Sequence, residues 1–165
     1  MGDMPDGHAR TTWSATWFRE APPGASTVIG MTSLQPELAV RHGRDAVAFY
    51  VAAFGATEIY RVGGTDESPS LVAQLTVGDA TFWVSDEAPE SGQHSPVTLG
   101  GGTVRLLLVV DDPRDVVDRA AALGATVDAP VHDEHGWLLG RIVDPFGHRW
   151  EIGHPLGEWP PPLHS

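Results

Sequence analysis

The densest group of side chains able to bind a metal ion or move a proton is the stretch HDEH at residues 132–135. Two histidines flank two carboxylates there, and both residue types are common ligands of divalent ions. The stretch falls between two predicted strands and lacks the helical spacing that would hold such ligands on one face. A solvated loop is therefore the favoured interpretation, and a metal site is the alternative.

Signatures of covalent catalysis and of phosphate binding are missing from the sequence. It contains no cysteine, which excludes disulfides, thiolate metal sites and a cysteine nucleophile. No serine stands in a nucleophile elbow, and no glycine-rich loop opens a helix where it would hold a phosphate. The three glycines at residues 100–102 precede a predicted strand, so they are interpreted as a hinge.

The amino-acid composition and net charge of the chain limit the kinds of molecule that it can bind. The chain has 165 residues, of which 41% are hydrophobic, enough for a globular protein with a real core. Its 10 basic and 22 acidic residues give a net charge of −12, which argues against nucleic acid or a membrane surface as partner. The first 30 residues lack the apolar stretch of a signal peptide, and the longest apolar run, at residues 106–110, is too short to cross a bilayer. We therefore expect a cytoplasmic protein.

The elements that would position a site follow one order twice. Hydrophobic periodicity and helix-stop glycines predict a strand, a helix, a strand and a hairpin in the first cycle, at residues 34–40, 43–55, 56–62 and 70–86. The second cycle repeats this order at residues 103–110, 112–124, 125–131 and 135–153. The corresponding organisation is a leader (1–30), a first module (31–90), a linker (91–102), a second module (103–154) and a proline-rich tail (155–165).

An internal repeat relates the two cycles. LAVRHGRDAV at residues 38–47 aligns with LVVDDPRDVV at residues 108–117 at a constant offset of 70. The hexapeptides AAFGAT and AALGAT contain Gly55 and Gly124, which end the two helices. A fixed internal period indicates duplicated units. Because one βαβββ unit covers only one sheet face with its helix, two tandem units predict an α+β fold with a curved mixed sheet around a cavity.

Two consecutive βαβββ units, with FYVAAFGA in the first and DPFGHRWEI closing the second, resemble the vicinal oxygen chelate superfamily. This superfamily includes glyoxalase I, extradiol dioxygenases, fosfomycin-resistance enzymes and bleomycin-resistance proteins. The resemblance covers about residues 34–154, and the best match within it is the PhnB-like branch. It implies sheets that curl around a small-molecule cavity, commonly completed by a homodimer.

In metal-dependent members of this superfamily four side chains hold a divalent ion, near the start of each module's first strand and on each module's last strand. The repeat carries these positions onto Gln35, Arg105, Trp83 and Glu151. Glu151 is a good ligand and Gln35 an acceptable one, whereas Arg105 and Trp83 offer no lone pair. A divalent ion needs three or four ligands. We therefore expect no metal at the family position and no other cofactor.

Two interpretations of Arg105 and Glu151 remain open. They form a buried ion pair that fills the former metal site, or Arg105 binds a carboxylate, phosphate or phenolate of a ligand while Glu151 orients it. Trp83 shares the expected cavity face and is a further candidate ligand contact. Tyr50 belongs to the family's helix, where the core is the default and a hydroxyl presented to the cavity is the alternative. Strand alternation places His148 on the opposite face from Glu151, which favours a structural role.

The leading hypothesis is a metal-free small-molecule binding protein of the glyoxalase/bleomycin-resistance type that sequesters an apolar or anionic metabolite or antibiotic. Its ligand contacts would come from Gln35, Trp83, Arg105, Glu151 and Tyr50. The alternative is an enzyme of the same fold. A metal-independent isomerase or hydrolase would use Glu151 as general base and Arg105 to stabilise negative charge. A metal-dependent lyase or dioxygenase is disfavoured by the number of ligands.

Overall fold

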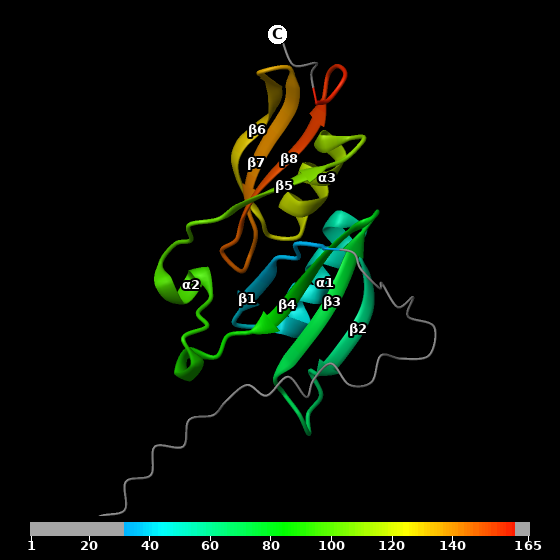
Figure 1. The fold of residues 1–165 in the computed structure, drawn as a ribbon. Helices are drawn as coiled ribbons and strands as arrows, with labels where there is room; N and C mark the ends of the chain where they lie inside the picture. The colour runs from blue at the N-terminus through cyan, green and yellow to red at the C-terminus, as the bar shows by residue number, and fades with distance from the viewer. Residues whose placement is uncertain (1–31, 161–165) are drawn as a thin grey trace, which may run out of the picture. The chain divides into compact units, whose positions relative to one another are not determined.

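The computed structural model describes residues 32–160, and of these residues 34–160 belong to one structural unit (Figure 1). The first module consists of β1 (Glu37–Val40), α1 (Gly43–Phe54), β2 (Thr57–Gly63), β3 (Leu71–Val77) and β4 (Ala80–Asp86). A connector follows, with the short helices η2 (Pro89–Ser91) and α2 (Pro96–Leu99). The second module consists of β5 (Arg105–Val109), α3 (Pro113–Ala122), β6 (Thr126–Glu134), β7 (Trp137–Val143) and β8 (Arg149–Pro155). The fold is therefore α+β with two tandem βαβββ modules, as predicted.

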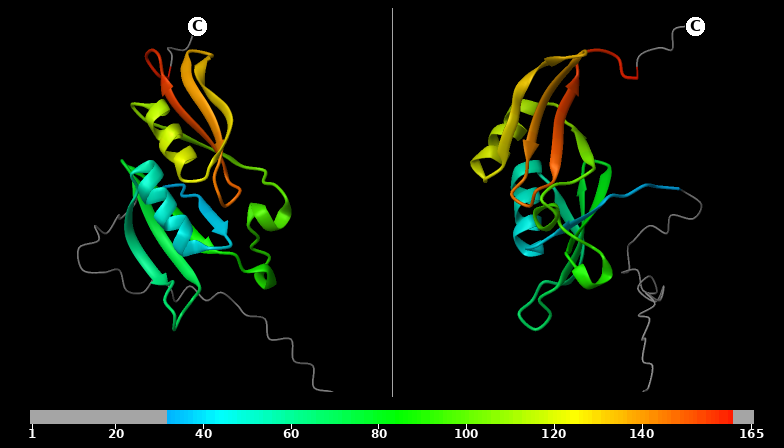
Figure 2. Two further views of the ribbon diagram at one scale, coloured as in Figure 1. Left: turned by 180° about the vertical axis from the view of Figure 1, so that it is seen from behind. Right: turned by 90° about the vertical axis from the view of Figure 1, so that its left-hand side faces the viewer.

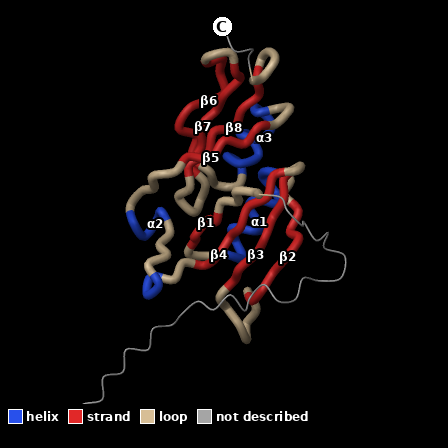
Figure 3. The backbone as a smooth tube through the Cα atoms, viewed as in Figure 1, coloured by secondary structure: helices blue, strands red, loops and turns tan. Residues whose placement is uncertain are grey.

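Within residues 32–160 the strands form two four-stranded mixed sheets, in the orders β1-β4-β3-β2 and β5-β8-β7-β6 (Figure 3). In each sheet the module's first strand runs parallel to its last strand, and the other neighbours are antiparallel. Helix α1 packs on the first sheet and α3 on the second, each along one face (Figure 2). The other face of each sheet carries no helix of its own module.

Local sequence explains both long helices. In α1 the buried side chains recur at helical spacing, which turns one face toward the sheet: Ala46, Val47, Tyr50, Ala53 and Phe54. Gly55 ends the helix at φ 69°, and its N–H donates to the carbonyl of Tyr50. Helix α3 begins at an N-cap, where the carboxylate of Asp112 accepts hydrogen bonds from the next two free backbone N–H groups.

The stretch at residues 132–135 differs from the prediction of a loop. Strand β6 continues to Glu134 and pairs with Trp137, so the turn is reduced to His135 and Gly136. Nη2 of Arg141 in β7 lies 2.8 Å from Oε2 of Glu134 in β6. This ion pair stabilises the pairing of the two strands near the turn. Within the described residues no group of three or more His, Cys, Asp or Glu side chains is arranged to hold a metal ion.

The connector between the modules is attached to the end of β4. The carboxylate of Glu87 accepts hydrogen bonds from the Thr98 hydroxyl at 2.7 Å and from the backbone N–H of Ser95 at 2.8 Å. These bonds, the one from Thr98 above all, lower the pKa of Glu87 to about 2. The predicted linker therefore contains an ordered helix, α2.

The predicted leader and residues 161–165 of the predicted tail lie outside the described residues. Among residues 32–160, no helix is long and apolar enough to span a membrane.

A buried carboxylate joins the two modules. Asp144, in the turn between β7 and β8, is 3% exposed. Its Oδ2 accepts hydrogen bonds from the hydroxyl of Tyr50 at 2.6 Å and from Nε1 of Trp150 at 2.9 Å. Its Oδ1 accepts the backbone N–H groups of Phe146 and His148, both at 2.9 Å. Burial raises the pKa of Tyr50 well above its ordinary value, and the charge of Asp144 raises it further.

Further contacts support this junction. The rings of Tyr50, Phe54 and Trp150 pack together, with centroids 4.8–5.7 Å apart. The guanidinium of Arg119 in α3 donates from Nε to the carbonyl of Ala53 in α1 at 3.1 Å. The ring Nε2 of His148 lies 3.0 Å from the carbonyl oxygen of Ala39 in β1. This contact is consistent with the structural role predicted for His148.

We predict that Asp144→Asn destabilises the protein by about 2 kcal/mol, because the new amide NH₂ would face two N–H or O–H donors in a buried site. Tyr50→Phe is the matched control. It removes one hydrogen bond and leaves the carboxylate with three, so it should cost about 1 kcal/mol. Urea unfolding at pH 7 measures both values. An Asp144→Asn variant as stable as the wild type would show that the hydrogen bonds of Asp144 contribute little to the free energy of unfolding.

Candidate functional site

Each sheet has one face that its helix covers and one face that its helix does not cover, which we call the open face. On each open face, one residue from each of the four strands is paired with its neighbours across the strands, and the four form a row. In the first sheet the paired residues are Glu37, Trp83, Gln74 and Tyr60. We call these four the first row. In the second sheet the equivalent positions hold Leu107, Glu151, Arg141 and Ala129, which we call the second row.

The pairing confirms the register that the sequence repeat assigned. Glu37 and Leu107 are 70 positions apart, the offset of the repeat, and they pair with Trp83 and Glu151 respectively. On β1, β3 and β4 the neighbours of the first row point the other way, toward α1, and they are buried, as Leu38, Leu75 and Val84 show at 4% exposure or less. Trp83 and Glu151 therefore occupy equivalent places on the two open faces.

Two glutamines and a tryptophan form a hydrogen-bonded group on the first sheet. The side-chain oxygen of Gln35 accepts a hydrogen bond from Nε1 of Trp83 at 2.8 Å. The same oxygen accepts a second one from Nε2 of Gln74 at 3.0 Å. The predicted pair Gln35 and Trp83 is thus in direct contact, and Gln74 joins it from the neighbouring strand.

Charged side chains form the equivalent group on the second sheet. Oε1 of Glu151 accepts hydrogen bonds from Nη1 of Arg105 at 2.8 Å and from Nε of Arg141 at 3.0 Å. Arg141 also donates from Nη2 to Glu134 at 2.9 Å. This contact lowers the pKa of Glu134, and the two carboxylates raise the pKa of Arg141.

The predicted contact between Arg105 and Glu151 is present, but it is not buried. The Arg105 side chain is 53% exposed and that of Glu151 is 20% exposed. The expectation of a buried ion pair is therefore wrong, because no other part of the described chain covers the start of β5. Arg141 lies between two carboxylates, whereas Arg105 donates only from Nη1 to a described partner. Arg105 retains donors for a further acceptor.

Sequence reasoning did not identify Gln74 and Arg141, the third members of the two groups. Each is the cross-strand neighbour of a predicted residue, Gln74 of Trp83 and Arg141 of Glu151. The signal was available for Gln74, since counting outward from the predicted turn at residues 78–79 pairs it with Trp83. It was not available for Arg141, because five residues separate β7 from β8, one more than the predicted turn at residues 144–147. Tyr50, in contrast, is fully buried and bonded to Asp144 on the helix side of the fold. Its default assignment to the core matches this position, and we leave it out of the site.

The four predicted positions lie on two separate sheets. Gln35 and Trp83 belong to the first sheet, and Arg105 and Glu151 belong to the second. Together they do not fit a divalent ion, because Arg105 and Trp83 offer no lone pair. Oε1 of Glu151 already accepts two guanidinium groups. The donor set is unsuited to metal, and we derive no chemistry through one.

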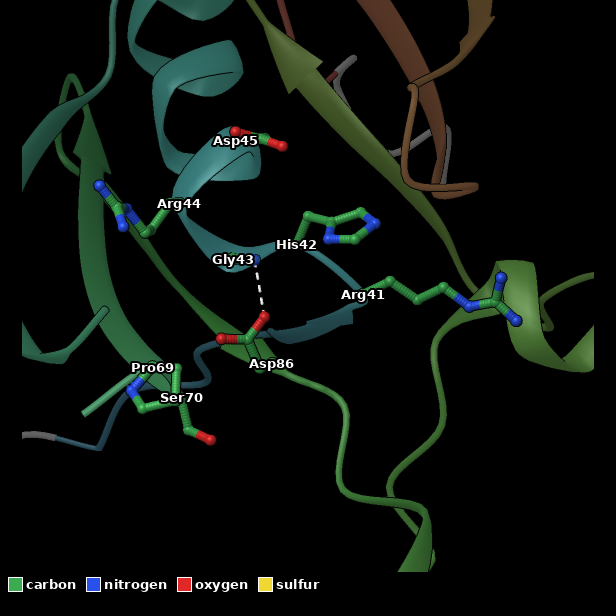
Figure 4. A pocket seen from close by; sticks show the side chains of 8 residues that line it. All are labelled: Arg41, His42, Gly43, Arg44, Asp45, Pro69, Ser70 and Asp86. Carbon is green, nitrogen blue, oxygen red and sulfur yellow. Dashed lines mark hydrogen bonds between the residues drawn. The ribbon is translucent and has the colours of Figure 1, made fainter. Parts of the chain in front are cut away.

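A separate hollow of about 510 Å³ lies at the start of α1 (Figure 4). It is lined by Arg41, His42, Gly43, Arg44, Asp45, Pro69, Ser70 and Asp86. The carboxylate of Asp86 accepts the backbone N–H groups of Gly43 and Leu71, each at 2.7 Å. The carboxylate of Asp86 therefore already occupies the first amide of α1, Gly43, and brings a negative charge to the place where an anion would bind, and we assign no function to the hollow.

Comparison with known proteins identifies the family. The model of the glyoxalase/bleomycin resistance protein/dioxygenase superfamily matches residues 30–152. The chain belongs to this superfamily. An uncharacterised protein of Mycobacterium tuberculosis (strain H37Rv) is 36% identical over 130 residues, which cover 76% of each chain.

Solved structures agree with the superfamily fold. The structure of an Arabidopsis thaliana gene product has 27% sequence identity and a TM-score of 0.57, covering 74% of this chain and 98% of its own. The fosfomycin resistance protein FosX from Mesorhizobium loti has 17% identity and a TM-score of 0.55, covering 78% and 93%. At that identity FosX supports the superfamily fold alone.

We predict that the protein stripped with EDTA has no stoichiometric Mn²⁺ site, because only two of the four family positions carry a donor atom suited to a metal. Electron paramagnetic resonance during a Mn²⁺ titration measures the free ion. Wild type and Glu151→Gln should leave the same amount of Mn²⁺ free. One bound ion per chain in the wild type, lost in Glu151→Gln, would refute the prediction.

Proposed function

We propose that the protein is a metal-free small-molecule binding protein of the glyoxalase/bleomycin-resistance type and of its PhnB-like branch. It acts in the cytoplasm and sequesters an apolar or anionic metabolite or antibiotic. The observation that carries the proposal is the state of Arg105, a half-exposed cation with unused donors on the open face of the second sheet. The superfamily relationship supports a small molecule as the ligand class.

The anionic part of the ligand is assigned to Arg105. A guanidinium presents its N–H groups in a planar fork that matches a carboxylate or phosphate with two parallel hydrogen bonds. Glu151 engages Nη1 of Arg105 and thereby orients the fork. Arg141 is a weaker candidate, because Glu151 and Glu134 already engage it from two sides.

Apolar surface lies beside this cation. Leu107 and Val109 follow Arg105 on the same face of β5, and they are 50% and 54% exposed. The side chains of Leu139 and Trp137 pack closely over Gly153 in β8. A Cβ at position 153 would lie only 2.9 Å from Leu139 and 3.2 Å from Trp137. An anion binder next to exposed aliphatic side chains suits a ligand with one charged end and an apolar body.

A homodimer is part of the proposal. In each chain, the first sheet carries the polar and aromatic first row, and the second sheet carries Arg105 and the second row. Strands β1 and β5 are edge strands in the described sheets, and exposed apolar side chains stand beside them, Leu34 at 96% and Val104 at 68%. A second copy that covers these edges would set the first row of one chain opposite the second row of the other and so enclose a cavity.

We predict that 2-naphthoate binds and that Arg105→Gln weakens this binding about 10- to 100-fold, the range for losing a hydrogen-bonded charge. The neutral analogue 2-naphthamide should bind both proteins equally. Arg44→Gln is the matched control, since Arg44 is an exposed arginine at the start of α1. Isothermal titration calorimetry measures the affinities. The proposal fails if 2-naphthoate does not bind, or if the Arg105 and Arg44 variants bind it equally.

The dimer has its own test. Light scattering after gel filtration should give about twice the 17.6 kDa of one chain. If each cavity uses Trp83 of one chain and Arg105 of the other, Trp83→Leu and Arg105→Gln homodimers should both bind 2-naphthoate poorly. Unfolding and refolding an equal mixture should restore about a quarter of the wild-type sites, because half of the dimers are mixed and each has one intact cavity. A monomer, or no recovery in the mixture, would overturn this arrangement.

A further inference from the structure

The first row combines two aromatic rings at a steep angle with one carboxylate. The rings of Trp83 and Tyr60 have centroids 5.9 Å apart and an interplanar angle of 71°. They meet above Gln74, which pairs with both residues in the sheet. Glu37 is exposed and pairs with Trp83 from the other side. The row therefore forms an aromatic corner with an acid beside it.

The carboxylate of Glu37 is held in place but is not neutralised. Its Oε1 accepts a hydrogen bond from Nε2 of Gln93 at 3.0 Å, and the same nitrogen contacts the hydroxyl of Ser85 at 3.0 Å. Gln93 belongs to the connector, so the connector fixes the orientation of an acid on the open face of the first sheet. No hydrogen bond to the second oxygen, Oε2, comes from the described residues.

Glu37 differs in this respect from the acids on the second sheet. Glu151, Glu134 and Asp128 each have an arginine partner within 3.0 Å. Among the ion pairs of residues 32–160, none includes Glu37. The first row itself contains no basic residue. It is thus a negatively charged aromatic surface in a chain whose net charge is −12.

We propose that Trp83, Tyr60 and Glu37 form a binding site for an organic cation, a substituted ammonium group of a small molecule. The faces of tryptophan and tyrosine attract a cation through the ring quadrupole, and two rings at a steep angle contact it from two sides. Glu37 supplies the full negative charge through Oε2. The net negative charge of the chain favours the approach of a cation over that of an anion.

This site lies on the first sheet alone, so it does not depend on the anion site proposed at Arg105 on the second sheet. If a homodimer brings the two faces together, one ligand would carry an ammonium group at one end and an anionic group at the other. Either half of that ligand is testable by itself, because the charged residues of the two sites differ: Glu37 binds the cation and Arg105 binds the anion.

Choline and its neutral isostere 3,3-dimethyl-1-butanol test the proposal, since the two molecules differ in one charged atom and have nearly the same shape. The indole N–H signal of Trp83 in ¹H–¹⁵N NMR spectra, assigned with Trp83→Phe, reports binding. Choline should bind about 50- to 300-fold more tightly than the isostere, since a cation–π contact of about 1–2 kcal/mol contributes about 5- to 30-fold and the charge of Glu37 about tenfold. Equal affinity, or no shift up to about 50 mM choline, would overturn the proposal.

Variants separate the charge from the aromatic rings. Glu37→Gln should weaken choline binding about tenfold and leave the isostere unaffected, because it removes the charge and keeps the shape. Glu90→Gln is the matched control, since Glu90 is an exposed glutamate in η2. Tyr60→Leu should weaken choline binding, because it removes one of the two rings that contact the cation. An equal effect of Glu37→Gln and Glu90→Gln would refute the site. Loss of 2-naphthoate binding alone would leave it intact.

Discussion

The buried carboxylate of Asp144 is the contact on which the arrangement of the two modules depends. An ionised group inside a protein is costly unless hydrogen-bond donors replace its water. Four donors surround Asp144 here, one of them the hydroxyl of Tyr50 in the other module. Because one of the donors comes from α1 and the other three from the β7–β8 turn and the start of β8, the carboxylate links these two parts of the fold. Both open sheet faces then remain on the sides away from the helices.

Much of the fold was predictable because its signals are local. Hydrophobic spacing and the left-handed C-cap at Gly55 define α1, and the constant offset of 70 residues relates the modules without any knowledge of contacts. Aligning the two hairpin turns assigned Trp83 and Glu151 to equivalent positions, and the strand pairing agrees. Position along a strand is a property of sequence period, so it can be predicted from one chain.

The parts that could not be predicted depend on contacts between strands. The β6–β7 pairing shifts register twice, between Val127 and Ala129 and again between Ala129 and His132. A shift moves every later cross-strand partner, so the contact of Arg141 with Glu134 could not be counted with assurance from the turn. The exposure of Arg105 likewise depends on which other segments pack over β5. The hydrophobic periodicity of β5 itself cannot predict those contacts.

The two hydrogen-bonded groups also bear on how such a protein changes over evolutionary time. Gln35, Trp83 and Gln74 are hydrogen-bonded to one another within the first sheet, and Arg105, Glu151 and Arg141 are within the second. A substitution in one group leaves the hydrogen bonds of the other group in place. The two modules of the repeat therefore hold a neutral group on one sheet and a charged group on the other. Selection can alter the ligand preference of one half while the other half is conserved.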